Sequence, residues 1–241
     1  MDITTPIHLE LVRVPAGEFL MGSDSKTDQD ASDDEQPQYR LSLPEFFIGK
    51  YPITNAQYAG FVTATHRKAP QHWEKGIIPS GKAEHPVGNV SWDDAADFCR
   101  WLSGATHRSF RLPSEAEWEK AARGSDGRIF PWGNPLPDEK RCNFGSKVGD
   151  TTPVGEYPDG VSPCGALDMA GNVWEWTGSI FKSYPYQPND GREDPGSGAA
   201  RVVRGGAYFD DEWLVRCAFR HYFDSLSVHR VIGFRVVSPG S

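Results

Sequence analysis

The sequence predicts an α+β fold with few helices, short antiparallel strands and much irregular loop. Helix-start motifs occur at three places, all in the first half of the 241 residues. Beyond about residue 124 helical periodicity disappears, and the 25 Gly and 19 Pro of the chain recur around short apolar runs. Helices followed by loops and short strands are typical of the α+β class. No internal repeat or linker interrupts the pattern, so we expect residues 1–241 to form a single domain.

The first elements are expected to be strands. Apolar residues alternate in Leu9–Val14 and Phe19–Met21, and Pro15-Ala16-Gly17 lies between them, which predicts a hairpin. Asp24–Glu35 follows with six acidic residues and one lysine. A run of like charge is typical of a solvated surface loop, which is the interpretation we favour. The D-x-D-x-D-G spacing of a calcium-binding loop is absent from it.

The three helices are expected to begin after Thr54, Ser91 and Ser114. Each of these residues precedes a Gln, Asp or Glu three positions later, which is the spacing of a capping box. Apolar residues then recur at helical spacing. Cys99 falls on the apolar face of the second helix, so we expect it to be a core residue rather than a nucleophile.

The rest of the chain predicts loops with short strands. The apolar runs are Arg128–Trp132, Pro153–Tyr157, Val173–Trp176, Arg201–Val203 and Gly233–Val237. Long loops in a compact domain often carry function. The functional residues are therefore expected in the second half of the chain.

Composition excludes several classes of protein. A hydrophobic content of 38% with 29 aromatic residues (8 Trp, 8 Tyr, 13 Phe) does not fit a disordered chain. No apolar run is long enough to cross a membrane. The net charge of −8 argues against nucleic-acid binding, although residues 198–241 hold six arginines against four acidic residues. The first residues lack the features of a signal peptide, so the default location is cytoplasmic and the four cysteines are expected to be reduced.

The most informative segment is Asp168–Glu175, which reads Asp-Met-Ala-Gly-Asn-Val-Trp-Glu. Its two terminal carboxylates bracket a Gly-Asn turn whose carbonyls can point inward. Such a set of oxygen atoms suits calcium. Alternatively, Asp168 and Glu175 satisfy backbone N–H groups beneath Trp174 and Trp176. The residues alone leave both interpretations open.

Several motifs together resemble those of the formylglycine-generating enzyme, or sulfatase-modifying factor, family. They are Val14–Ser23, Phe110–Gly124, Pro131–Asn134, Asp168–Glu175, Arg204–Gly206 and Gly233–Val237. The resemblance covers roughly residues 9–238 and implies the family's variant of the C-type lectin fold. It also implies a structural calcium site formed by Asp168, the carbonyls of Gly171 and Val173, and Glu175.

The resemblance does not by itself imply an activity, because one fold hosts enzymes and binding proteins. In the oxidase members two cysteines bind copper between the Gly-Gly turn and an Arg-Cys-Ala segment. Here the corresponding stretch, Tyr208–Val215, contains no cysteine, so no copper is expected. The family's iron-dependent sulfoxide synthases take metal ligands from an additional helical domain. The seven histidines are scattered, and the common hydrolase, zinc-protease and nucleotide-binding motifs are absent.

A different branch of the family suggests a binding role. Variable proteins of diversity-generating retroelements end in a diversified stretch between Arg-Gly-Gly and Gly-Phe-Arg. Adenine randomisation of asparagine codons cannot produce Lys, Gln, Glu, Met or Trp. Residues 214–241 contain none of these five types, although the whole chain holds 40 such residues.

We therefore predict a non-catalytic recognition domain with a C-terminal binding surface. Rigid aromatic and short polar residues alternate there, as in antibody paratopes. The candidate ligand-binding residues are Tyr208, Phe209, Asp210, Asp211, Trp213, Phe219, His221, Tyr222, Phe223, Asp224, Ser225, Ser227 and His229. About half of the aromatic ones are expected to be exposed. Arg204, Arg216, Arg220 and Arg235 are expected to brace the loops through carboxylates or carbonyls.

The expected partner is a protein or a cell-surface glycan, and the sequence leaves open whether the chain works alone or as part of a larger multidomain protein. The alternative function is that of a formylglycine-generating oxidase or another metal-dependent oxidoreductase of the same family.

Overall fold

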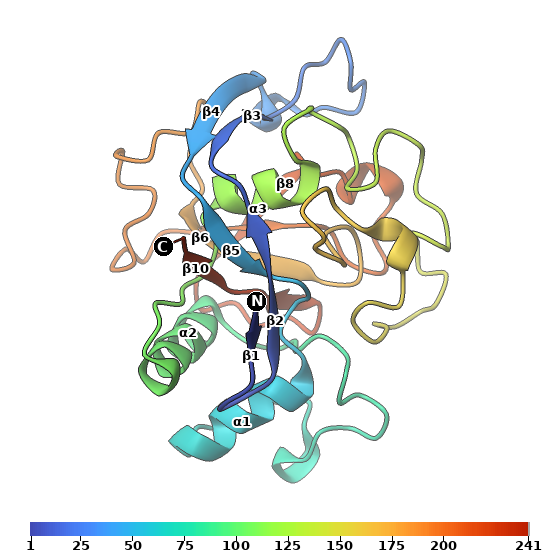
Figure 1. Cartoon of the computed structure of the whole chain (residues 1–241). Helices are drawn as coiled ribbons and strands as arrows, with labels where there is room; N and C mark the ends of the chain where they lie inside the picture. Colours follow the sequence, from blue (N-terminus) through green and yellow to red (C-terminus); the bar gives the residue numbers. More distant parts are fainter. Residues whose placement is uncertain (241) are drawn as a thin grey trace.

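The structure is a computed structural model that describes residues 1–240, and its α+β architecture confirms the predicted class. One four-stranded sheet has the order β1-β2-β5-β10, formed by Asp2–Ile3, Leu9–Val14, Phe46–Gly49 and Val237–Pro239. A second has the order β8-β7-β6-β9, formed by Arg220–Phe223, Arg201–Arg204, Trp174–Ile180 and Ile232–Phe234. In Figure 1 the helices α1 and α2 lie at the lower end of the molecule, with α2 at the level of β1.

The three predicted helices form where their caps indicate. They are α1 (Asn55–Thr65), α2 (Trp92–Thr106) and α3 (Glu115–Arg123). Thr54, Ser91 and Ser114 each accept a hydrogen bond from the backbone N–H three residues later, and each completes a capping box. Because the cap residues supply partners for the free N–H groups of the first turn, the start of each helix is encoded locally.

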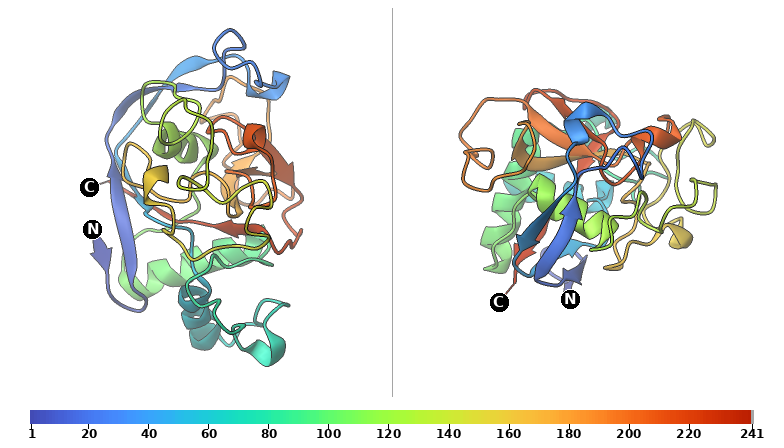
Figure 2. Two further views of the ribbon diagram at one scale, coloured as in Figure 1. Left: turned by 90° about the vertical axis from the view of Figure 1, so that its right-hand side faces the viewer. Right: turned by 90° about the horizontal axis from the view of Figure 1, so that it is seen from above.

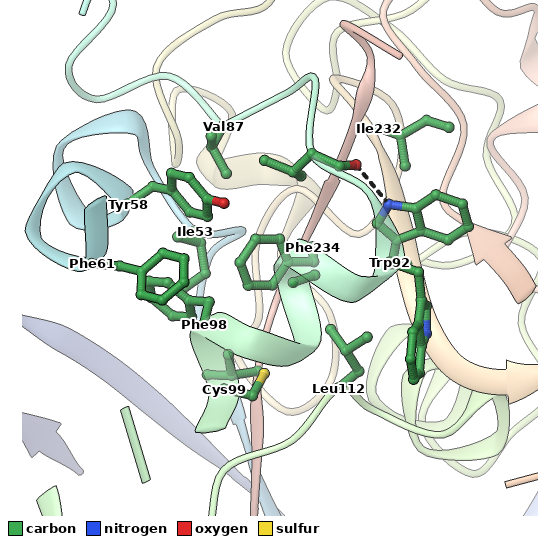
Figure 3. Close-up of a cluster of buried hydrophobic side chains, with 14 of the residues drawn as sticks. Ile53, Tyr58, Phe61, Val87, Trp92, Phe98, Cys99, Leu112, Ile232 and Phe234 are labelled. Atoms are coloured by element: carbon green, nitrogen blue, oxygen red, sulfur yellow. Dashed lines mark hydrogen bonds between the residues drawn. The ribbon is translucent and has the colours of Figure 1, made fainter. Parts of the chain in front are cut away.

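The largest buried cluster joins the first two helices to both four-stranded sheets. Phe234 of β9 packs against Phe98 of α2 with ring centroids 5.2 Å apart, and Tyr58 of α1 is stacked on Phe98 at 5.9 Å. Figure 3 shows these rings together with Cys99. Cys99 is 2% exposed, which confirms the prediction that it is a core residue. The C-terminal strands are therefore part of the main core.

The predicted hairpin of the first two runs is wrong, although both runs are strands. β2 pairs antiparallel with β5, whereas β3 (Gly17–Met21) pairs antiparallel with β4 (Tyr39–Leu43). Alternation of apolar residues identifies a strand but does not identify its partner. The Pro-Ala-Gly turn therefore passes the chain from one sheet to another.

The second half is as irregular as predicted, with one difference in strand direction. Three of the five apolar runs contain strands: Val173–Trp176 overlaps β6, Arg201–Val203 lies in β7, and Gly233–Val237 overlaps both β9 and β10. Arg128–Trp132 and Pro153–Tyr157 contain none. The expected strands were antiparallel, but β9 pairs with β6 in parallel. The chain reaches β9 after crossing from the opposite edge of the sheet, where β8 lies, and this crossover sets the direction.

The acidic segment Asp24–Glu35 is not a wholly solvated loop. Glu35 is 0% exposed and Asp28 is 7% exposed, although the other four acidic residues of the segment are at least partly accessible. Arg216 binds both buried carboxylates, with nitrogen–oxygen distances of 2.7 Å. The prediction failed here because the partner of these carboxylates lies about 180 residues further along the chain.

Across residues 1–240, no helix combines the length and the apolar character of a segment that crosses a bilayer. All four cysteines are unpaired thiols, as expected.

Candidate functional site

The candidate site is the segment between β7 and β9, which is rich in exposed apolar side chains. Ten large hydrophobic residues of residues 1–240 are exposed, and five of them lie within positions 209–228. We call these five residues the C-terminal face: Phe209, Trp213, Tyr222, Leu226 and Val228. In the left view of Figure 2 the red loops and the short strand β8 of this segment lie across the molecule from both chain ends.

The predicted site residues divide into three groups by exposure. Exposed are Phe209, Asp211, Trp213, His221, Tyr222, Asp224 and His229; half-buried are Asp210, Phe219, Phe223, Ser225 and Ser227; and Tyr208 is buried. Five of the eight aromatic residues are thus exposed, close to the expected half. Tyr208, at 5% exposure, belongs to the main core cluster and not to the exposed face. Its backbone N–H donates to the carbonyl of Asn172, which holds it inward.

Aromatic packing fixes the orientation of the half-buried rings. Phe219 lies between Trp174 and Trp213, with centroid distances of 5.9 and 5.4 Å. Phe223 packs edge-on against His221 at 4.9 Å and lies 5.3 Å from His229. Each exposed aromatic residue thereby rests on an inner ring, which lowers the entropy that binding would cost.

Sequence reasoning missed Phe181, Leu226 and Val228. Phe181 packs against Tyr222 with ring centroids 4.4 Å apart, and it lies at the start of a separate loop. Leu226 is 75% exposed. The sequence did contain a signal for the last two: in Ser225–Val228 an apolar residue follows each serine. Only the serines of this stretch were predicted to contact a ligand.

Backbone hydrogen bonds anchor the segment on both sides. The N–H of Gly145 donates to the carbonyl of Asp210 at 2.8 Å, from a loop on one side. The N–H of Trp92, at the start of α2, donates to the carbonyl of Ser225 at 3.0 Å. Irregular backbone that is tied down in this way presents its side chains in a fixed arrangement.

Two titratable groups lie at the edge of this surface. Burial raises the pKa of Asp210, whose Oδ2 accepts the Ala207 N–H at 2.8 Å. Partial desolvation of the ring lowers the pKa of His221. The exposed surface is aromatic and also carries the charged side chains of Asp211, Glu212, Asp224 and Arg230.

Buried arginines hold the segment between β7 and β9 from its core side, as the sequence predicts. Arg220 of β8 forms two hydrogen bonds of 2.7 Å with the carboxylate of Glu115. Arg204 of β7 pairs with Glu119 and also donates to the carbonyls of Cys217 and Phe219. Both glutamates belong to α3, so this helix is joined to the strands on either side of the site.

The Asp168–Glu175 segment is held by protein groups. Arg235 donates to both carboxylate oxygens of Glu175, at 2.6 and 2.7 Å, and the indole N–H of Trp118 donates to Oε2 at 2.8 Å. Asp168 accepts the backbone N–H of Gly155 at 2.7 Å. Asp168 thus satisfies a backbone N–H group, as in the second interpretation, whereas Glu175 accepts from side chains and not from the backbone. Because a guanidinium already pairs with Glu175, a calcium ion bound by these four residues would have to compete with Arg235 for this carboxylate.

Calcium binding by Asp168, Gly171, Val173 and Glu175 stays a prediction that a thermal melt can test. The protein is treated with EDTA and then melted with and without millimolar CaCl2, with MgCl2 as the control. A calcium-specific rise in Tm that E175Q removes would support the site. Equal melting curves would mean that the Glu175–Arg235 pair alone stiffens the scaffold.

Three of the four thiols lie apart from one another in the core. Cys99, Cys142 and Cys217 are buried in three different hydrophobic clusters. Burial raises the pKa of Cys142 and Cys217 to about 12. Copper(I) binds thiolates, and burial in apolar surroundings disfavours the thiolate form.

The fold and this site define a formylglycine-generating-enzyme-type variant of the C-type lectin fold, with an aromatic C-terminal loop segment. The protein-family model for the sulfatase-modifying factor enzyme 1-like domain matches residues 5–239 of this chain. The chain belongs to this family.

Curated relatives carry several different names. The chain is 34% identical to the formylglycine-generating enzyme of Streptomyces coelicolor, over 82% of this chain and 78% of that protein. It is 34% identical to the serine/threonine-protein kinase Pkn1 of Chlamydia trachomatis serovar L2, over 95% of this chain and 38% of that protein. It is 33% identical to the hercynine oxygenase of Mycolicibacterium smegmatis, over 88% of this chain and 57% of that protein. The chain thus spans well under two thirds of the last two.

Solved structures confirm the fold. PvdO from Pseudomonas aeruginosa superimposes with a TM-score of 0.82 at 26% identity, covering 97% of this chain and 95% of that one. The Treponema denticola variable protein 1 superimposes with a TM-score of 0.80 at 20% identity, covering 100% and 99%. At this identity the second likeness concerns the fold alone.

Proposed function

We propose that this chain is a non-catalytic recognition domain that binds its partner through the C-terminal face. The observation that carries the proposal is the concentration of exposed apolar side chains at positions 209–228, on a segment fixed by buried ion pairs. Contiguous exposed apolar surface is typical of interaction sites. Trp and Tyr in particular supply large contact area at a low entropy cost. The partner we propose is a protein or a cell-surface glycan.

The same proposal includes diversification of the segment by a retroelement. Its support is the absence of Lys, Gln, Glu, Met and Trp from residues 214–241. Trp213 and Glu212 would then be fixed by the template. A near-identical template with adenines at the codons for 208–231, beside a reverse transcriptase gene, is the genomic observation expected. Without such a template the segment is an ordinary binding loop.

Two face variants test the binding surface. Trp213→Ala and Tyr222→Ala remove exposed rings, so each should leave Tm nearly unchanged while weakening binding by tenfold or more, the usual loss at a hot spot (about 1.4 kcal/mol or more). Leu136→Ala is the matched control, because Leu136 is also exposed, at 65%, but lies outside the face. Candidate ligands come from a glycan array and from cross-linking of the chain to surface proteins. A ligand whose affinity is the same for both face variants and the wild type contradicts the proposal.

The alternative is an oxidase like the formylglycine-generating relatives, and their 34% identity to this chain is the observation that favours it. The test is incubation with a cysteine-containing sulfatase peptide, copper(I) and oxygen, followed by aldehyde detection with a hydrazide probe. Aldehyde formation that depends on the protein would establish the oxidase. We expect none, because residues 208–215 supply no thiol.

A further inference from the structure

A well-formed cavity lies outside the C-terminal face. It has a volume of about 650 Å3 and opens between α2, the start of α3, β6 and the loop after β6. Its walls are mainly apolar and aromatic. Its wall residues include Trp92, Ala96, Phe110, Leu112, Tyr186 and Glu193. A volume of this order is typical of sites for small organic molecules.

Glu193 is the unusual group in this cavity. Its Oε1 accepts hydrogen bonds from the hydroxyl of Tyr186, at 2.8 Å, and from that of Ser179. Its Oε2 has no hydrogen-bond partner within residues 1–240, and it lies beside Gly178, another wall residue. Burial raises the pKa of Glu193, and the negative charges of Glu117 and Glu115 raise it further. One carboxylate oxygen is thus left for a ligand.

The other charged groups of the cavity are already paired. Both carboxylate oxygens of Glu117 accept from Arg111, at 2.6 and 2.7 Å. Arg100, at the rim, pairs with Asp97. Among the wall residues, the Glu193 carboxylate is therefore the charge without a salt-bridge partner. An ammonium group would complement it, and the buried Arg201 guanidinium, which is held by carbonyls, offsets only part of its charge.

The loop that carries Glu193 is fixed by Arg201. This buried guanidinium donates to the carbonyls of Gly178, Asp194 and Ser197 at 2.8 to 2.9 Å. It also lies over the ring of Trp92, 4.0 Å from the centroid. The carboxylate and the aromatic wall are therefore held in a defined arrangement before any ligand arrives, which lowers the entropy cost of binding.

We propose that this cavity binds a small organic amine, with its ammonium group on Glu193 Oε2 and its apolar body between Trp92, Phe110 and Leu112. An ammonium donates a charge-assisted hydrogen bond to a carboxylate. A flat ring fills the space between aromatic walls. A neutral or anionic molecule of the same shape would leave the Glu193 carboxylate without a counter-charge.

The experiment uses three indole compounds that differ only in the terminal group: tryptamine, tryptophol and indole-3-propionate. Binding is followed by ligand-observed NMR and calorimetry. Tryptamine is expected to bind with saturation and at least tenfold more tightly than the alcohol or the acid. Glu193→Gln keeps an oxygen for Ser179 and Tyr186 but removes the charge, so it should abolish the preference for the amine. Glu139→Gln, at a side chain that is 78% exposed, is the control.

A second variant blocks the space without touching the carboxylate. Ala96→Leu places a larger side chain in the cavity from the half-buried side of α2, where leucine suits a helix. This variant should weaken the binding of all three compounds and leave Tm unchanged. Trp213→Ala should change nothing, because the C-terminal face is a separate site. Equal affinity for amine and alcohol, an unchanged preference in E193Q, or no saturable binding of tryptamine would each overturn the inference.

Discussion

Arg235→Met is expected to destabilise the protein by about 3–5 kcal/mol, the usual cost of removing one partner from a buried ion pair. Arg235 and Glu175 are both 0% exposed, so the substitution leaves a carboxylate charge in the core. Arg235 also donates to the carbonyls of Gly49, Leu167 and Asp168, and these interactions are lost as well. The strands β5, β6 and β9 lose the group that joins them.

The measurement is urea unfolding followed by tryptophan fluorescence, together with a thermal melt. For a domain of this size the expected fall in Tm is roughly 10 °C. Arg13→Met is the matched control, because Arg13 pairs with Glu45 at the surface and is 62% exposed, so little change is expected. Glu175→Gln in the Arg235→Met background should recover part of the loss, since it removes the unpaired charge. A loss for Arg235→Met no larger than that of the control would contradict the role given to this pair.

Arg216→Met is expected to have an effect of similar size and to release the acidic segment. Its guanidinium joins Asp28 and Glu35 to the carbonyl of Trp213, in the candidate site. Burial by itself raises the pKa of Glu35, but the pKa is lowered overall because Arg216 stabilises the carboxylate. A carboxyl whose pKa is lowered by folding stabilises the fold at pH values above its pKa in the unfolded chain, which is about 4.3. This stability is lost as the pH falls below that value.

The cost of Arg216→Met should therefore be about 3–5 kcal/mol near neutral pH and should shrink as the pH falls below about 4. Trypsin should also cleave faster after Lys26, which is exposed within the same segment, and mass spectrometry detects the fragment. Arg40→Met, at a 70% exposed position on the neighbouring strand, is the control. If the penalty is independent of pH, Glu35 is not the group that Arg216 neutralises.

The helices were predictable from the sequence because their signals are local. Ser91 and Asp94 are three residues apart and cap each other, so no distant residue is needed to begin α2. The position of Cys99 on the apolar face of that helix follows from the same periodicity. The arginines near the C-terminus were also recognised as braces, since a buried guanidinium needs carboxylates or carbonyls.

Strand pairing and burial were less predictable. The alternation of apolar residues in Leu9–Val14 fits any partner strand. Its pairing with β5 depends on how the whole sheet packs. Glu35 looked like one more charge of an acidic loop until Arg216 was placed beside it. Tyr208 resembled its exposed neighbours in composition, and its burial depends on the backbone of Asn172.

By itself the sequence determined the α+β class, the family, the three helices and the segment in which the candidate binding residues lie. These follow from short-range patterns and from motifs that can be read along the chain. Only the tertiary structure decided which acidic residues are buried, which aromatic residues form the C-terminal face, and that Glu193 faces a cavity. Each of these depends on contacts between residues far apart in the sequence, where burial and charge pairing are set by the packed fold and not by local pattern.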